Sequence, residues 1–297
     1  AVRATRCGSA SGTDGGAAMK RSSSVRGATV LVTGAARGMG ELYARRAVAE
    51  GADRLALWDV DSGRLDALAA ELAEACGGGT EVRAYAVDLA DRERVTEAAE
   101  RVLAELGTPD VLINNAGIVR GAPFWEHDPE RDIEATMRVN ALAPMHLTRA
   151  LLPAMMADRA RPRRILNIAS AAGTLANPNM SVYAASKWAM IGWSESLRLE
   201  LRRSGYERFG VTVFCPSYIS TGMFAGARGP LLTPIMTPER ATRAAWEGML
   251  AGTPVVSKPW TVKLAMALRG VLPTRLWDAI AGRVFHVYSS MDRFTGR

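Results

Sequence analysis

The feature that most constrains the fold is a regular alternation of short apolar runs and longer segments with helical periodicity. The apolar runs lie at residues 28–34, 54–59, 81–89, 110–117, 163–170, 210–217 and 253–258. Between them, helical spacing occurs near residues 38–50, 62–76, 91–106, 130–157, 181–203 and 237–251. The first six runs are almost continuously apolar, as buried parallel strands are. The sequence therefore predicts an α/β fold: one doubly wound parallel sheet of about seven strands, with helices on both faces.

Composition divides the chain into three parts. Residues 1–27 hold almost no large apolar side chain and predict a disordered leader. We expect residues 1–18 to be dispensable, so that a chain starting at Met19 stays soluble and active. Residues 28–258 carry the whole alternating pattern and predict one domain, with an irregular insert at 218–236. Residues 259–297 predict a basic, amphipathic C-terminal extension.

The charge distribution argues against a nucleic-acid partner. The net charge is +7, but residues 1–28 carry +4 and residues 258–297 carry +5, which leaves −2 between them. A groove that binds phosphates requires its basic side chains on the folded body. We therefore expect no nucleic-acid binding.

The rare metal-binding and redox residues are scattered. Three cysteines and three histidines show no spacing typical of metal ligands. We expect no metal site and no disulfide framework, which fits a reducing, cytoplasmic location. No apolar run reaches the ~18 residues that a membrane-spanning helix needs.

A glycine-rich turn, TGAARGMG, joins the first predicted strand to the first predicted helix. Glycines let the backbone approach a pyrophosphate, and the helix N-terminus offers N–H groups and the positive end of its dipole. Glycine also makes tight turns for purely structural reasons, so the position between strand and helix carries the prediction. The turn predicts a dinucleotide site that includes Thr33, Gly34, Arg37, Gly38, Met39 and Gly40.

Two aspartates end the second and third predicted strands. Asp59 is placed to bind the adenosine ribose and to repel a 2′-phosphate, which favours NAD over NADP. Arg37 acts in the opposite direction, so NADP stays open. Asp88, followed by Leu89, is placed to bond the adenine amino group. The alternative for either aspartate is an N-cap of the next helix.

Tyr183 and Lys187 share one face of the predicted helix 181–203. Six tyrosines and four lysines in 297 residues give about 0.08 such pairs by chance. Ser170 ends the fifth run, and Asn140 lies inside the predicted helix 130–157, where an amide competes with the backbone. A nearby cation lowers the pKa of a phenol from about 10, toward the range useful for acid–base catalysis. The compact ammonium of lysine suits this better than arginine.

These residues resemble the classical short-chain dehydrogenase/reductase family over residues 28–258. The glycine turn, NNAG (114–117), Asn140, Ser170 and YAASK occur in the order and approximate spacing of that family. The resemblance implies a Rossmann fold, hydride transfer with a nicotinamide cofactor, and self-association as a dimer or tetramer. It implies that Tyr183 is the general acid/base, Lys187 lowers its pKa and binds the nicotinamide ribose, Ser170 holds the substrate oxygen and Asn140 fixes a water.

The resemblance also extends the cofactor site. It implies contacts from the end of the fourth run, although a bare NNAG is also typical of a strand-end turn. After the sixth run the family usually has Pro-Gly, whereas this chain has Ser217 in place of that glycine. The additional residues expected to bind the cofactor are Asn115, Ala116, Gly117, Pro216, Ile219 and Thr221.

The expected substrate pocket lies between the loop 171–180 and the insert 218–236. Apolar, methionine-rich walls suit a bulky lipophilic substrate, although the same residues are also typical of core. Arg228 is the one basic candidate there. Besides Ser170 and Tyr183, the expected substrate residues are Leu175, Met180, Met223 and Phe224, with Leu231, Leu232 and Met236 as further lining candidates.

The C-terminal extension allows two interpretations. Trp260, Leu264, Leu268 and Val271 share a helical face, with basic residues elsewhere. Such a helix binds an anionic membrane surface, or it packs on the core as a lid or subunit contact. The LALWD strand end and residues 268–280 resemble, more loosely, the hydroxysteroid and retinol dehydrogenase branch, which implies a lipophilic alcohol.

The favoured function is hydride transfer between NAD and a lipophilic secondary or allylic alcohol or ketone. One alternative is an NADPH-dependent 3-oxoacyl reductase, against which Asp59 argues. Another is a dinucleotide-binding regulator without catalysis. The presence of Asn140, Ser170, Tyr183 and Lys187 argues against that regulator.

Overall fold

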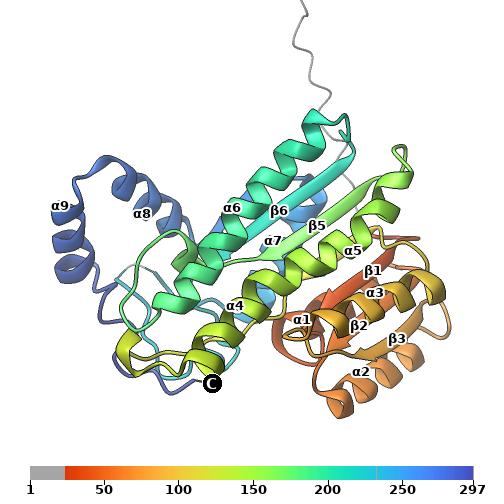
Figure 1. Cartoon of the computed structure of the whole chain (residues 1–297), viewed down its shortest axis with the longest axis horizontal. Helices are drawn as coiled ribbons and strands as arrows, with labels where there is room; N and C mark the ends of the chain where they lie inside the picture. The colour runs from red at the N-terminus through yellow and green to blue at the C-terminus, as the bar shows by residue number, and fades with distance from the viewer. Residues whose placement is uncertain (1–23, 232, 297) are drawn as a thin grey trace, which may run out of the picture.

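The computed structural model describes residues 24–231 and 233–296, so most of the expected leader, and Leu232, lie outside the described residues. Its centre is a sheet of seven parallel strands, as predicted, and the strand order is β3-β2-β1-β4-β5-β6-β7 (Figure 1). The strands are β1 (Thr29–Thr33), β2 (Arg54–Asp59), β3 (Glu81–Ala86), β4 (Val111–Asn114), β5 (Arg163–Ile168), β6 (Phe209–Pro216) and β7 (Val255–Lys258).

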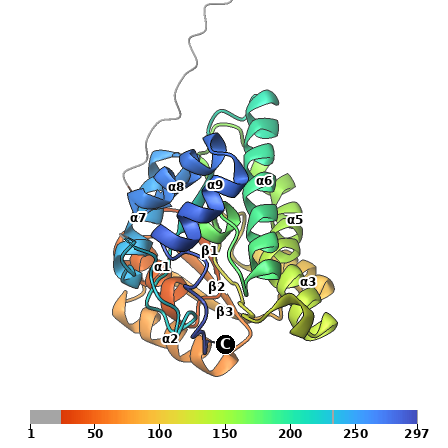
Figure 2. The ribbon, with the colours of Figure 1, turned by 90° about the vertical axis from the view of Figure 1, so that its left-hand side faces the viewer.

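Helices cover both faces of this sheet, as Figure 2 shows. One face packs against α1 (Gly38–Ala49), α2 (Ser62–Ala75) and α7 (Pro238–Ala251). The other packs against α3 (Arg92–Glu105), α5 (Ala143–Ala157) and α6 (Ser181–Arg203). Every residue of β1, β5 and β6 is buried, because helices shield both sides. The doubly wound fold is thus confirmed.

The chain reverses its direction of winding between β1 and β4, which are neighbours in the sheet. β2 and β3 lie on one side of this point and β5 to β7 on the other. In sheets of this kind, ligands bind beyond the carboxyl ends of the strands at such a switch point. The glycine turn after β1 and the NNAG segment after β4 therefore meet at one edge of the sheet.

The predicted helix 130–157 is interrupted near Asn140. It consists of a π-helical turn η2 (Pro129–Glu134), α4 (Ala135–Met137), a second π-helical turn η3 (Arg138–Leu142) and α5. The Asn140 amide exchanges two hydrogen bonds with the backbone of Ile118, each 2.8 Å. π-Helical turns inside helices occur often at functional sites. The short 3₁₀ turn η1 (Phe124–Glu126) precedes this region.

The C-terminal extension forms two helices rather than one amphipathic segment. α8 (Trp260–Val271) ends before Pro273, which lacks the N–H that would continue the helix, and α9 (Thr274–Ala279) runs into the π-helical turn η5 (Ile280–Val284). Arg269 anchors α8. Its Nη1 donates to the Thr174 carbonyl at 2.6 Å, and its guanidinium lies 4.6 Å from the Trp188 ring centroid. The extension therefore lies beside the segment after β5.

Within residues 24–231 and 233–296, no helix combines the length and hydropathy needed to cross a membrane.

A buried ionic cluster ties the starting ends of three strands together. Asp110 precedes β4 and accepts a hydrogen bond from the Thr29 amide of β1 at 2.9 Å. Arg161 donates to both of its carboxylate oxygens, at 2.5 and 2.6 Å, and Arg163 of β5 donates to Oδ1. Asp110 and Arg163 are both buried. Removing one partner of such a pair leaves an uncompensated buried charge.

We expect Asp110→Ala to lower the free energy of unfolding by about 3–5 kcal/mol, because Arg163 would lose its carboxylate. Urea unfolding followed by circular dichroism measures this. Glu71→Ala is the matched control: it removes a carboxylate from Arg45, but that pair is solvent-exposed. Equal destabilisation by the two substitutions would contradict the assigned role of Asp110.

Candidate active site

The glycine turn after β1 is built for close backbone packing. Gly34 has a φ of +64°, and a Cβ there would lie 2.8 Å from the Cα of Ala116. A Cβ at Gly40 would lie 1.9 Å from the Gly34 carbonyl oxygen. These positions accept glycine alone without rearrangement, so α1 begins directly against the ends of β1 and β4.

Thr33 and Asn115 join the two strand ends. The Thr33 hydroxyl accepts hydrogen bonds from the amides of Asn115 (3.0 Å) and Ala116 (3.1 Å). The Asn115 side chain in turn donates to the carbonyls of Thr33 (2.9 Å) and Gly34 (3.2 Å). Both residues were predicted to bind the cofactor; the structure gives them the task of holding the turn that would bind it.

Asp59 and Asp88 are not N-caps of the following helices. Asp61 caps α2 and Asp91 caps α3, so that alternative was wrong. Asp59 is buried, and its carboxylate accepts hydrogen bonds from the amides of Ala36 (3.0 Å) and Asp61 (3.1 Å). It therefore lies against the glycine turn, where the prediction put it. Asp88 accepts from the Ala90 amide at 2.9 Å.

The segment after β6 reaches the same turn. Pro216 ends β6, Ile219 forms a bridge with Met236, and a Cβ at Gly38 would lie 3.7 Å from the Thr221 methyl group. Thr221 therefore packs beside the glycine turn at Gly38. Met39 is buried in the core, and Leu89 packs against α3 and its neighbours. For these two residues the structure shows core packing.

Asn140 connects three of the predicted elements. Besides Ile118, its amide donates to the Ser186 hydroxyl of α6 at 3.1 Å. A Cβ at Gly117 would lie 3.2 Å from the Asn140 Oδ1 and 3.4 Å from the Lys187 Nζ. NNAG, Asn140 and Lys187 are therefore brought together, as the sequence predicted.

Tyr183, Lys187 and Ser170 complete this cluster. The first two share the inner face of α6, and all three are buried. The Lys187 Nζ donates to the Ile168 carbonyl at 2.9 Å and lies 5.7 Å from the Tyr183 ring centroid. The Ser170 hydroxyl accepts from the Ala172 amide at 3.1 Å, which begins the short 3₁₀ turn η4 (Ala171–Gly173).

Burial dominates the electrostatics of this cluster. It lowers the pKa of Lys187 to about 8, because the ammonium form loses water. It also raises the pKa of Tyr183 above its ordinary value, while the hydrogen bond with Ser170 acts in the opposite direction. The expected lowering of the Tyr183 pKa is therefore outweighed by burial in this structure.

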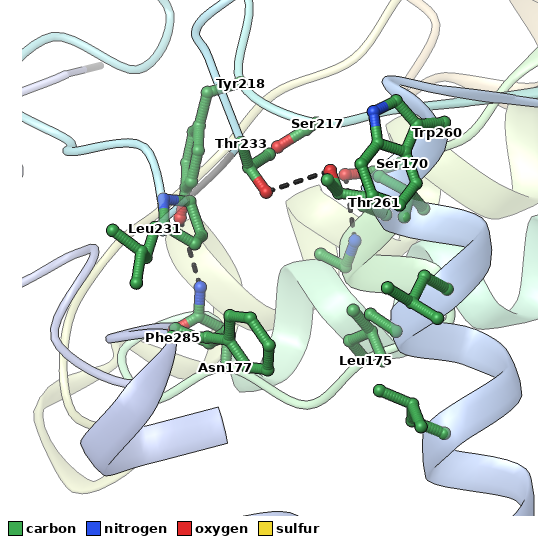
Figure 3. A pocket seen from close by; sticks show the side chains of 18 of the residues that line it. Ser170, Leu175, Asn177, Ser217, Tyr218, Leu231, Thr233, Trp260, Thr261 and Phe285 are labelled. Atoms are coloured by element: carbon green, nitrogen blue, oxygen red, sulfur yellow. Dashed lines mark hydrogen bonds between the residues drawn. The ribbon is translucent and has the colours of Figure 1, made fainter. Parts of the chain in front are cut away.

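A cavity of about 930 Å³, open mouth included, extends from Ser170 toward the C-terminal extension. Figure 3 shows Tyr218, Asn177 and Leu231 on one side and Ser170, Thr261 and Trp260 on the other. Its walls are mostly apolar, and no described Arg or Lys lines it. Of the predicted substrate residues, Ser170, Leu175, Met180, Phe224 and Leu231 line it.

The other predicted substrate residues lie elsewhere. Met223 and Tyr183 do not line the cavity themselves, but they pack in one cluster with Met180 and Phe224, which do. Met236 packs against the core, and Arg228 is not among the residues that line the cavity. The insert folds back on itself, so that Met236 pairs with Ile219, and a sequence pattern does not reveal this.

Sequence reasoning missed much of the cavity wall. Leu264, Leu268, Trp277, Phe285 and Val287 of the C-terminal extension line it. The i, i+4 spacing of Trp260, Leu264 and Leu268 was visible in the sequence but did not say what the face covers. Ser217, the departure from Pro-Gly, also lines the cavity.

Comparisons with known proteins agree with this geometry. A family model described as short chain dehydrogenase matches residues 28–230. The chain is 35% identical to estradiol 17-beta-dehydrogenase 11 of Pongo abelii over 267 residues, 89% of this chain and 86% of that one. It is also 35% identical to epidermal retinol dehydrogenase 2 of Mus musculus over 277 residues, covering 92% and 87%. The chain belongs to the short-chain dehydrogenase family.

Solved structures of other short-chain dehydrogenases share this fold. One from Burkholderia phymatum in complex with NAD aligns with a TM-score of 0.74 and 26% identity, over 83% of this chain and 94% of that one. One from Sphingobium yanoikuyae in complex with NADPH aligns with a TM-score of 0.69 and 30% identity, over 86% and 93%. This short-chain dehydrogenase is therefore an NAD(P)-dependent oxidoreductase that acts on CH–OH groups.

The chain's own residues fit a bound dinucleotide. Side chains cap α2 and α3, but no side chain caps the N-terminus of α1, so its first N–H groups face the glycine turn without such a partner. Free N–H groups at a helix N-terminus bind pyrophosphate. Asp59 ends β2, the strand that pairs with β1.

Burial of the Lys187 ammonium lowers the free energy of unfolding of the protein. A pKa lowered from 10.5 to about 8 corresponds to about 3 kcal/mol against the charged folded form. We expect Lys187→Met to raise the free energy of unfolding at pH 7 by about 1–3 kcal/mol. This value already subtracts the stabilisation that is lost with the hydrogen bond to the Ile168 carbonyl. The gain should shrink as the pH rises above 8 and disappear near 10.5, since neutral lysine carries no such cost.

Denaturant unfolding at pH 7, 8.5 and 10 measures this gain. Lys263→Met, at an exposed position of α8, is the control and should change the stability little. A Lys187→Met protein that is less stable than the parent at pH 7 would show that the ammonium contributes net stabilisation.

Proposed function

We propose that this short-chain dehydrogenase transfers a hydride between NAD and a lipophilic, steroid- or retinoid-like secondary or allylic alcohol or ketone. The observation that carries the proposal is the apolar cavity that begins at Ser170 and contains no described basic side chain. Such a cavity fits a bulky neutral substrate. The printed names of the relatives, an estradiol dehydrogenase and a retinol dehydrogenase, support this substrate class.

Four side chains of this protein have separate roles in the proposed reaction. Tyr183 gives a proton to the carbonyl oxygen or removes one from the alcohol, and Ser170 holds that oxygen by a hydrogen bond. Lys187 favours the phenolate of Tyr183 and binds the nicotinamide ribose. Asn140 holds a water between Lys187 and solvent. The nicotinamide, when bound, supplies the hydride chemistry, and the protein supplies orientation and the proton path.

The proposed preference for NAD rests on the end of β2. Asp59 ends β2 and Asp61 follows two residues later, so a 2′-phosphate bound beside this strand end would meet two negative charges. Their repulsion of that phosphate outweighs the attraction by Arg37, which is a single, exposed cation. Solved relatives bind either cofactor, so this preference is specific to the residues of this chain.

We expect Tyr183→Phe to lower kcat by about 10²–10⁴-fold while the dissociation constant for NAD stays the same, because the proton donor is lost and the cofactor contacts remain. The assay follows reduced-nicotinamide absorbance with estradiol, retinol and simple terpenoid alcohols, with NAD and NADP side by side. Calorimetric titration measures NAD binding.

Tyr206→Phe is the control for this experiment, because Tyr206 lies at the far end of α6 under Arg159. Retained turnover in the Tyr183→Phe protein would refute the assigned role. Absence of turnover by the parent with every alcohol would refute the proposed substrate class, and higher kcat/KM with NADP would refute the cofactor preference.

We further propose that the C-terminal extension contacts an anionic membrane surface. Val271 of α8 is 83% exposed and Leu276 of α9 is 48% exposed, and Lys263, Arg275 and Arg283 are exposed on the same two helices and η5. Apolar and basic side chains together bind a charged lipid surface. α8 also lines the cavity, so the lid interpretation and the membrane interpretation are compatible. Self-association stays a prediction from the family resemblance.

We expect the double substitution Val271→Asp, Leu276→Asp to abolish sedimentation with vesicles of phosphatidylcholine and phosphatidylserine, because it removes both apolar contacts and adds repulsion. The parent protein should sediment with these vesicles and not with pure phosphatidylcholine. Leu199→Asp, at an exposed position of α6, is the control and should sediment like the parent. Equal sedimentation of the double variant and the parent would rule out this contact.

A further inference from the structure

Three polar side chains from distant parts of the chain meet at the cavity wall. Asn177 follows η4, Tyr218 follows β6, and Ser290 belongs to the C-terminal extension. The Asn177 amide lies 3.1 Å from the Tyr218 hydroxyl and 2.9 Å from the Ser290 hydroxyl. The two hydroxyls lie 2.8 Å apart. Asn177 and Tyr218 line the cavity, whereas Ser290 lies behind them and is buried.

The hydrogen-bonding capacity of this cluster is not fully used. The Ser290 hydroxyl donates to the Val287 carbonyl at 2.6 Å, so the hydrogen of Tyr218 is the donor toward Ser290 or Asn177. A tyrosine hydroxyl donates one hydrogen and also accepts a hydrogen bond. The Asn177 amide satisfies both its ends when its oxygen faces the two hydroxyls, and the Tyr218 hydrogen is then donated to that oxygen or to Ser290. In this orientation no protein donor fills the acceptor position of the Tyr218 oxygen. An acceptor held beside an apolar cavity favours a ligand that donates a hydrogen bond.

The cluster lies on the cavity wall opposite Ser170, and one phenyl ring separates Tyr218 from Tyr183. Phe224 contacts both tyrosine rings edge-on, with ring centroids 5.8 Å from Tyr183 and 5.4 Å from Tyr218. Figure 3 shows Tyr218 and Asn177 on the side opposite Ser170. A substrate whose reacting oxygen binds at Ser170 would therefore extend along apolar walls toward Tyr218. Two hydrogen bonds and the ring contact fix the position of the phenol, so it is ready to bind without reorganisation.

We propose that Tyr218 is a specificity-determining residue that accepts a hydrogen bond from a second hydroxyl of the substrate, on the cavity wall opposite Ser170. The substrate class is thereby narrowed to lipophilic alcohols or ketones that carry two oxygen functions, of which the distal one is a hydroxyl. This inference rests on the proposed function. It adds a preference that the apolar cavity alone does not produce.

The experiment uses reduction of ketones, so that the second hydroxyl does not react. Androstan-17-one is compared with derivatives that carry one further hydroxyl at C3, C6 or C11, and with the methoxy counterpart of the best of them. We expect the parent protein to favour one hydroxy ketone over androstan-17-one by about fivefold to tenfold in kcat/KM, mostly through KM, because one net hydrogen bond is gained. The methoxy ketone, which cannot donate, should lose this preference.

Tyr218→Phe keeps the ring and its contact with Phe224 and removes the hydroxyl. We expect the ratio of kcat/KM between the hydroxy ketone and androstan-17-one to fall to about one. Tyr288→Phe is the matched control: it removes a tyrosine hydroxyl of the C-terminal extension, one that bonds Asp278 at 2.5 Å, and should keep the ratio of the parent.

Each outcome decides between binding and a merely structural role. Equal kcat/KM for all ketones in the parent protein, or an unchanged ratio in Tyr218→Phe, would overturn the inference and leave the proposed function standing. So would a fall of kcat/KM for both ketones by the same factor, since that indicates a structural role. If the parent reduces none of these ketones, the proposed function fails and the inference with it. If Tyr218→Phe does not fold, the methoxy comparison in the parent decides.

Discussion

The buried amide of Asn140 is the interaction on which the arrangement of the site depends. It accepts from and donates to the backbone of Ile118 and donates to Ser186, so it joins the segment after β4 to the inner face of α6. The helix around it gives up its regular hydrogen bonding and forms the π-helical turn η3. A fully buried amide is costly unless its partners are satisfied. The bonds of Asn140 therefore hold Gly117 and Lys187 at contact distance and keep the catalytic face of α6 beside the cofactor edge of the sheet.

The cavity depends on a second set of contacts, those of the C-terminal extension. Arg269 holds α8 through the Thr174 carbonyl and the Trp188 ring, and Ser290 holds the last segment through Tyr218 and Asn177. Both contacts end on the loops that follow the catalytic strands β5 and β6. The cavity of this short-chain dehydrogenase is therefore walled in part by residues that lie more than 40 positions beyond Tyr218 in the sequence. The glycine turn, NNAG and Asp59 come from the first half of the sheet, and Thr221 reaches the turn from the segment after β6.

The sequence predicted the fold and named four residues, Asn140, Ser170, Tyr183 and Lys187, that the structure brings together, but it predicted the cavity wall poorly. Strand runs were recognisable because strands buried on both faces are almost continuously apolar, and α6 was predicted with its observed bounds. Tyr183, Lys187, Ser170 and Asn140 were found because few residue types can perform acid–base work at these positions. Met223, Met236 and Arg228 were misplaced because an irregular insert has no period from which the direction of a side chain follows. For Asp59 and Asp88, the sequence left open the alternative that each one caps the next helix. The observed N-caps, Asp61 and Asp91, exclude that alternative.

The sequence by itself determined the parallel sheet, the glycine turn and the four residues of the catalytic cluster, because local periodicity and rare residue types encode them directly. Tertiary structure alone decided which surfaces enclose the substrate. It also decided that the phenol of Tyr183 is buried enough for its pKa to be raised, and that Asn177, Tyr218 and Ser290 form one cluster. The physical reason is that burial and hydrogen-bond partnership depend on contacts between segments far apart in the chain, which no local pattern specifies.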